Sequence, residues 1–179
     1  IYEALMQEFR HDLKRWSAEI DPEDITISFT GHSLIQFEQG QDIVQPEFKK
    51  IIDEFFPRYT KLLKNYNNDI KKLRIEGHTS SEWAKYDSDH EKYLKNLDLS
   101  QRRAFNVLKY SLETLSSDNE LSWVKTKIGS EGLSSSKYLK NIFGLEIRIL
   151  RKKQTFFEPW KLPNYFDWRL QLHAQENYL

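Results

Sequence analysis

The sequence predicts an α/β sandwich, in which helices pack on a mixed β-sheet. Two kinds of segment lead to this fold class. In some, apolar residues recur every three or four positions, as in an amphipathic helix; in others they alternate with polar residues, as in a half-buried strand. The segments follow the order helix, strand, helix, strand, helix and then one or two strands, which favours helices layered on a sheet. The 179 residues are enough for one domain with a sizeable core.

Residues 1–20 are predicted to form a helix that stops at Asp21-Pro22, because the residue before a proline is disfavoured in helical conformation. The apolar face of this helix is formed by Tyr2, Met6, Phe9, Leu13 and Trp16. A strand is then predicted over residues 25–30, where Ile25, Ile27 and Phe29 alternate with polar residues.

The strongest helix signal lies in residues 46–64, which carry an unbroken apolar stripe. Pro46 suits the first turn of this helix, and Pro57 is expected to kink it. A second strand should end at Gly77, because Leu73 and Ile75 alternate with charged residues just before it.

A third helix is predicted to begin near Leu99, with Asp98 and Gln101 as a capping box or with Ser100 as the N-cap. Its buried face is formed by Ala104, Val107, Leu108, Leu112 and Leu115. A short strand ending at Gly129 and a clearer one over residues 145–149 complete the sheet.

Composition excludes several classes of function. Lys plus Arg and Asp plus Glu each number 27, and this balance argues against a surface for nucleic acid or anionic membrane. The chain has no cysteine, which excludes disulfides and thiolate catalysis. It has no apolar run long enough for a membrane span. It opens with "IYEAL", without an initiator Met or a signal peptide, and we expect a fragment of a longer protein.

No catalytic or cofactor motif stands out. A metal or hydrolase site could be imagined from His and acidic residues, but they lack the spacing of known metal motifs. These residues are His32, His78, Asp87, Asp89 and Glu91. A solvated acidic loop is the preferred interpretation, so no metal, no cofactor and no enzymatic activity are expected.

The stretch "NLDLSQRRAFNV" carries the most specific signal in the chain. It fits the pattern N-x-x-L-S-x-x-R-A-x-x-V at Asn96, Leu99, Ser100, Arg103, Ala104 and Val107. A predicted strand that ends in Gly77-His78-Thr79 precedes it. Together, the two motifs resemble the OmpA-like peptidoglycan-binding domain, which also closes MotB-type stator proteins. The resemblance covers roughly residues 24 to 150.

The resemblance implies a non-catalytic domain that binds the stem peptide of peptidoglycan, chiefly its diaminopimelate residue. Arg103 would bind a carboxylate of that residue, and a guanidinium suits this role because it can form a bidentate, charge-assisted bond. We also expect Arg103 in the first turn of its helix, where the dipole favours an anion. The ligand site would further include Asn96, Thr79, Ser80, Leu99 and Ser100. Gly77 and His78 would be structural, with His78 buried and donating to a backbone carbonyl.

The chain departs from the family pattern where Ser80 replaces the Asp that pairs with the amino group of the ligand. We expect Glu82, Asp87 or Asp89 to supply the missing anion. The Asn-Arg-Arg that normally precedes the final strand is also absent. An alternative interpretation makes Arg103 a simple surface ion pair. The domain would then be a dimerisation or scaffold module that has lost its ligand.

The predicted organisation has three parts. Residues 1–20 form a linker helix to an upstream membrane segment, residues 21–150 the peptidoglycan-binding domain, and residues 151–179 an aromatic extension packed on the domain or at a dimer interface. The resemblance implies the periplasmic domain of a bacterial inner-membrane protein, a homodimer that anchors an ion-driven channel or motor partner to the cell wall. A ZorB-like stator subunit, of the kind found in anti-phage defence, is one candidate; a flagellar or lipoprotein member is another.

Overall fold

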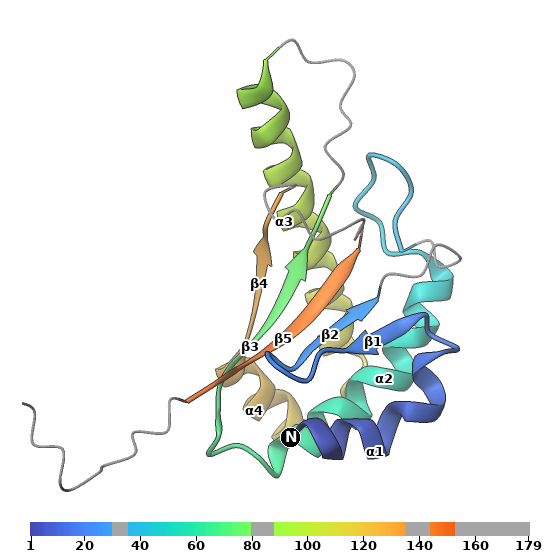
Figure 1. Ribbon diagram of the computed structural model, residues 1–179, viewed down its shortest axis with the longest axis vertical. Coiled ribbons are helices and arrows are strands. Elements are labelled where there is room, and N and C mark those ends of the chain that lie inside the picture. The colour runs from blue at the N-terminus through green and yellow to red at the C-terminus, as the bar shows by residue number, and fades with distance from the viewer. Residues whose placement is uncertain (30–35, 80–87, 135–143, 153–179) are drawn as a thin grey trace, which may run out of the picture.

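The computed structural model describes residues 1–29, 36–79, 88–134 and 144–152 and confirms the predicted layered fold (Figure 1). Its single five-stranded sheet has the order β1-β2-β5-β3-β4. Only the β3–β4 pair is parallel, so the sheet is mixed. The strands are β1 (Ala18–Ile20), β2 (Thr26–Phe29), β3 (Ile70–Gly77), β4 (Ile128–Gly132) and β5 (Leu145–Arg151). The helices are α1 (Tyr2–Leu13), α2 (Pro46–Lys64), α3 (Asp89–Glu113) and α4 (Asp118–Lys127).

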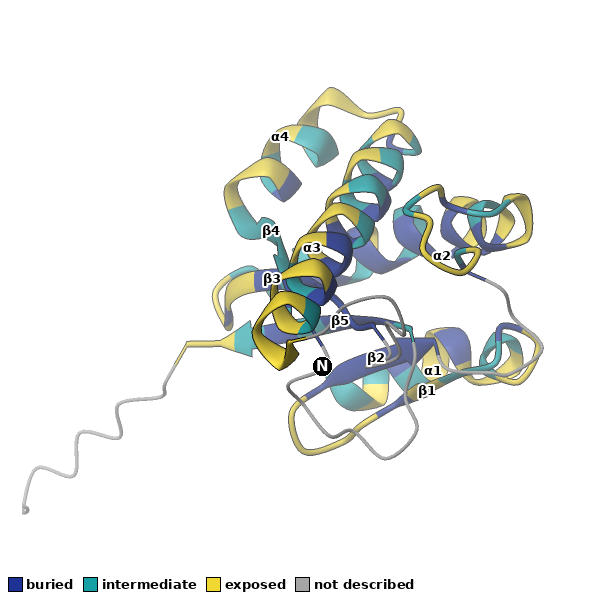
Figure 2. Cartoon of the chain, turned by 90° about the horizontal axis from the view of Figure 1, so that it is seen from above, coloured by how far each residue is buried: buried dark blue, intermediate teal, exposed yellow. Residues whose placement is uncertain are grey.

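The core lies between one face of the sheet and the helices. Helices α2, α3 and α4 are on the same side of the sheet (Figure 2). The predicted stripe of α2 is buried there, and the Phe29 ring of β2 lies 5.5 Å from both Phe48 and Phe55. Helix α2 continues through Pro57 without interruption. Burial of these large aromatic side chains is the main stabilising contribution of this layer.

Helix α3 packs unusually close to β3 and β4, and two glycines permit this approach. A Cβ atom on Gly77 would lie 2.3 Å from the carbonyl oxygen of Ser100, and one on Gly132 would lie 2.4 Å from the backbone nitrogen of Gln101. Gly77 is therefore required for helix–strand packing rather than for a turn. The spacing of α3 over the sheet is set at these positions.

The N-terminal segment is shorter as a helix than predicted. Helix α1 ends at Leu13, and residues 18–20 form β1, which pairs with β2. Phe9 and Trp16 are both buried, and the Phe9 ring lies 5.2 Å from Phe55 of α2. Residues predicted to act as a linker helix thus also pack on the common core.

Helix α3 begins at Asp89, ten residues before the predicted start. Ser88 is its N-cap, because its Oγ accepts a hydrogen bond from the Glu91 amide at 3.2 Å. The predicted caps, Asp98, Gln101 and Ser100, lie inside the helix. The first turns of α3 extend beyond the sheet (Figure 1), so the apolar periodicity that reveals a helix is weak there.

Residues 118–127, where the sequence indicated a strand, form α4, and β4 starts only at Ile128. Val124 is the buried residue of this helix, and Leu121 and Trp123 pack against the core cluster. Too few apolar residues mark the short amphipathic face for its period to be recognised.

None of the helices in the described part of the chain combines the length and hydrophobicity needed to cross a bilayer. The predicted C-terminal extension lies, from residue 153 onward, outside the described residues.

Candidate functional site

The motif in α3 is mainly a packing pattern. Its spacing of three and four residues places one set of side chains against the sheet, where all are buried: Asn96, Leu99, Ser100, Ala104 and Val107. Arg103 is the motif residue that is only half-buried. The motif therefore fixes α3 on the sheet and leaves its arginine at the surface.

Arg103 holds the segment that connects β2 to α2. Its Nε donates to the Gln41 carbonyl at 2.8 Å, and its Nη2 donates to the Glu38 carbonyl at 3.1 Å. Its guanidinium carbon also lies 4.8 Å from the centre of the Phe37 ring. Burial lowers the pKa of the Arg103 guanidinium, and the nearby carboxylate of Asp42 opposes this shift. One edge of the guanidinium is thus occupied by backbone carbonyls.

The expected position of Arg103 in the first turn of its helix is wrong. Fourteen residues of α3 separate it from the first helical residue, Asp89 (103 − 89 = 14). The free N–H groups and the dipole act only within the first turn. Any affinity of Arg103 for an anion must come from its own charge and donors.

Two neighbours of Arg103, which the motif did not single out, hold the same connecting segment. Arg102 Nε lies 2.9 Å from Asp42 Oδ2, and Asn106 Nδ2 donates to the Asp42 carbonyl at 2.8 Å. The adjacent basic pair in "QRRAFN" was a usable signal, but the segment that both arginines hold lies 60 to 65 positions away in the sequence. Residues 36–45 are therefore held by α3 at several points.

Thr79 and Ser100 join β3, α3 and the end of β4. The Thr79 amide donates to the Ser134 carbonyl at 3.4 Å, and its Oγ1 donates to the Asn96 carbonyl at 3.5 Å. Ser100 Oγ accepts from the Ser134 amide at 3.0 Å. These buried side chains position the end of β3 beside α3. Ser80, the next predicted residue, lies outside the described residues.

His78 is buried as predicted, and one side of its ring faces a carboxylate. Nε2 lies 3.3 Å from Glu146 Oε2. Burial alone would raise the pKa of Glu146, but His78, together with Ser28 and Arg148, lowers it below its usual value. The carboxylate is therefore charged at neutral pH.

The three residues proposed to supply an anion are not equally placed. Asp89 is fully exposed at the start of α3. At 1.5 Å per residue, the offset of fourteen positions between it and Arg103 corresponds to about 21 Å along the helix. One ligand residue cannot contact both side chains. Glu82 and Asp87 lie outside the described residues.

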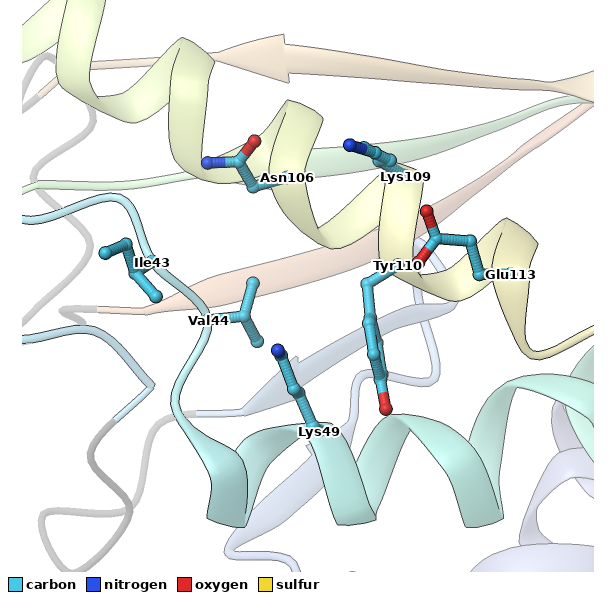
Figure 3. A pocket seen from close by; sticks show the side chains of 7 residues that line it. All are labelled: Ile43, Val44, Lys49, Asn106, Lys109, Tyr110 and Glu113. Carbon is cyan, nitrogen blue, oxygen red and sulfur yellow. The ribbon is translucent and has the colours of Figure 1, made fainter.

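A cleft of 240 Å³ lies beside the segment held by Arg103, between α2 and α3 (Figure 3). Lys49 of α2 and Tyr110 of α3 extend into it from opposite sides, with Lys49 Nζ 5.0 Å from the centre of the Tyr110 ring. Tyr110 Oη also donates to Asp53 at 2.9 Å. The cleft is lined by Ile43, Val44, Lys49, Asn106, Lys109, Tyr110 and Glu113. Lys109 of α3 and Lys49 of α2 place two further basic side chains at this cleft.

Comparison with known proteins gives a family match and a curated relative. The model of the OmpA family matches residues 36–137. The Zorya protein ZorB of Escherichia coli strain Crooks is 38% identical over 156 residues, which cover 87% of this chain and 66% of that protein. The chain thus spans just under two thirds of its relative.

Two solved structures share the fold at low sequence identity. A MotB-like protein from Desulfovibrio vulgaris aligns with a TM-score of 0.57 and 17% identity, covering 84% of this chain and 92% of that chain. The cell wall anchor of the T6SS from Pseudomonas aeruginosa aligns with a TM-score of 0.54 and 17% identity. The alignment covers 83% of this chain and 97% of that chain. These structures support the arrangement of helices and strands.

Proposed function

The chain belongs to the OmpA family, and from this premise we propose that its domain binds the stem peptide of peptidoglycan. Domains of this family are binding modules rather than enzymes, as the sequence predicted. The proposed ligand contact is between Arg103 and a carboxylate of the diaminopimelate residue. The observation that carries the proposal is the half-buried guanidinium of Arg103 at the motif position, whose N–H donors are only partly used.

The hydrogen bonds of Arg103 leave room for such a ligand. Nε and Nη2 each donate one bond to backbone carbonyls, and no ion pair within the described residues involves Arg103. A guanidinium has five N–H donors, so those of Nη1 and the second of Nη2 can form a fork for a carboxylate. Thr79, Asn96, Leu99 and Ser100 contribute by holding β3 and α3 in register, and Ser80 lies next to this wall in the sequence.

The amino group of diaminopimelate requires an anion, and we propose Glu82 or Asp87 for this role. The distance along α3 argues against Asp89. Single substitutions to Gln and Asn test the assignment by the binding of purified peptidoglycan fragments. If neither change weakens binding, the amino group is recognised elsewhere.

At the level of the whole protein, we propose a cell wall anchor for a stator-type membrane complex. The support is the 38% sequence identity with ZorB over 87% of this chain. The domain would then be periplasmic and homodimeric, and a channel or motor subunit would be its membrane partner. The residues before 21 would connect it to the membrane, and those after 150 would pack on the domain or at the dimer interface.

The deciding experiment is sedimentation of the protein with purified peptidoglycan sacculi. Arg103→Ala should weaken the affinity for sacculi at least about tenfold, because a charge-assisted contact contributes roughly 1.5–3 kcal/mol. Arg102→Ala is the matched control: it removes the ion pair with Asp42 that holds the same segment but leaves the Arg103 guanidinium in place. Equal binding by the wild type and Arg103→Ala would refute the role of Arg103.

A second candidate function is a dimerising scaffold of the same fold without a ligand. Ser80 in place of the family Asp favours it, since a neutral hydroxyl replaces only part of a charged contact. In that case the wild type would fail to sediment with sacculi but would still form dimers in analytical ultracentrifugation.

A further inference from the structure

The face of the sheet turned away from α2, α3 and α4 carries a cross-strand row in which four of the five strands place an acidic residue and β2 places Ser28. Cross-strand pairing aligns Glu19 with Ser28, Ser28 with Glu146, Glu146 with Glu76, and Glu76 with Glu131. Glu76 and Glu146 are 1% and 3% exposed, respectively. Buried carboxylates require compensation, because their desolvation costs several kcal/mol each.

Two arginines in the neighbouring cross-strand row supply part of this compensation. Arg148 pairs with Asp24, its Nε lies 3.3 Å from Glu76, and its Nη2 lies 3.6 Å from Glu146. Arg74 pairs with Glu131 at 2.5 Å and approaches Glu76 at 3.6 Å. Both guanidinium groups are shared among several acids, so negative charge remains in excess on this face.

Several acids border a cavity of 330 Å³ beside the β1–β2 turn. Four carboxylates and one guanidinium line it, together with two hydroxyls and two apolar side chains. The lining residues are Glu19, Ile20, Asp21, Pro22, Asp24, Thr26, Ser28, Glu146 and Arg148. The formal charge of the lining is thus −3 (four acids against one arginine).

One buried polar atom in the cavity wall lacks a hydrogen-bond partner within the described residues. Thr26 is 3% exposed, and its Oγ1 has no hydrogen bond to any described residue. Glu146 is also buried; its Oε1 accepts from Ser28 at 3.2 Å, and its Oε2 lies 3.3 Å from His78 Nε2 and 3.6 Å from Arg148 Nη2. An unsatisfied buried polar atom costs about 1–3 kcal/mol, which a suitable donor would recover.

A metal ion does not suit this face. Within the described residues, the closest set of metal-ligating atoms belongs to Glu76, His78 and Glu146, which lie within 4.8 Å of one another. Arg148 contacts both carboxylates, and Arg74 approaches one of them. A divalent ion would therefore stand beside two fixed positive charges.

We propose that this cavity binds a primary ammonium group at the end of an aliphatic chain. This is the chemistry of a lysine side chain or of a free diamine. The ammonium has three N–H donors for Glu146 and Thr26, and the outer acids, Glu19 and Asp21, attract its charge. Ile20 supplies apolar surface for the methylene groups. The cavity lies on the opposite side of the sheet from Arg103, so the two sites are separate.

The test is a titration of the ¹⁵N-labelled protein followed by NMR. One arm uses cadaverine as the free diamine, and the other uses Nα-acetyl-lysine N-methylamide as the blocked side chain. Saturable shifts at β1, β2 and β5 support the proposal, and the tighter of the two ligands identifies the source. Equal binding of tetramethylammonium, which has no N–H donors, would overturn it. So would shifts caused by Ca²⁺ but by neither amine.

Two variants and a control complete the test. Thr26→Val keeps the β-branched shape and should weaken binding about fivefold without loss of stability, because the hydroxyl it removes is unpartnered. Glu146→Gln should weaken binding at least about tenfold. Glu131→Gln alters the same acidic row outside the cavity and should leave affinity unchanged. Wild-type affinity in a folded Thr26→Val protein would contradict the proposed contact.

Discussion

Gly77→Ala should destabilise the protein by displacing α3 from the sheet. The added Cβ would lie 2.3 Å from the Ser100 carbonyl oxygen, whereas ordinary contact begins near 3.4 Å, so the overlap is 1.1 Å (3.4 − 2.3). The obstacle is helix backbone, and it cannot rotate away as a flexible side chain would. Overpacking of this kind costs about 1–3 kcal/mol.

Urea unfolding monitored by tryptophan fluorescence measures this cost. With a slope of about 1–3 kcal/mol per molar urea, the midpoint should fall by about 1 M. Because α3 also carries Arg103, sacculus binding should weaken in the folded fraction. Gly129→Ala is the matched control, since its Cβ would meet only the end of the Lys72 side chain at 3.2 Å. The packing argument is wrong if the Gly77→Ala midpoint equals that of the wild type.

Two further predictions concern charge and capping. The pKa of Glu146 is lower in the folded state, so its charge stabilises the fold above its unfolded value of about 4.5, and this contribution is lost as the pH falls through the lowered folded pKa. Thermal unfolding should therefore show a steeper loss of stability below pH 4.5 in the wild type than in Glu146→Gln; parallel curves would contradict this. Ser88→Ala should lower the free energy of unfolding of the first turns of α3 by about 1 kcal/mol, because it removes the N-cap hydrogen bond. Hydrogen exchange there should accelerate while β3 stays protected, and unchanged exchange would rule out the cap.

Much of the fold could be predicted from the sequence, because periodicity is a local property. Helix α2 and strands β2, β3 and β5 were predicted because their apolar residues repeat with the right period. The predicted start of α3 and the prediction of a strand where α4 lies were wrong. The first turns of α3 and the whole of α4 bury few side chains, so no apolar pattern marks them. The candidate site was predicted only as a motif, and its residues turned out to divide between packing and surface roles.

The sequence by itself determined the layered fold, the family and the arginine that stands out within the α3 motif. Only the tertiary structure decided that Arg103 holds residues 38–41, that His78 faces Glu146, and that the acids of four strands align in one row. The physical reason is the range of the interactions. Helical and strand periods depend on neighbours a few residues away, whereas strand register and charge compensation depend on segments that are brought together only when the chain folds.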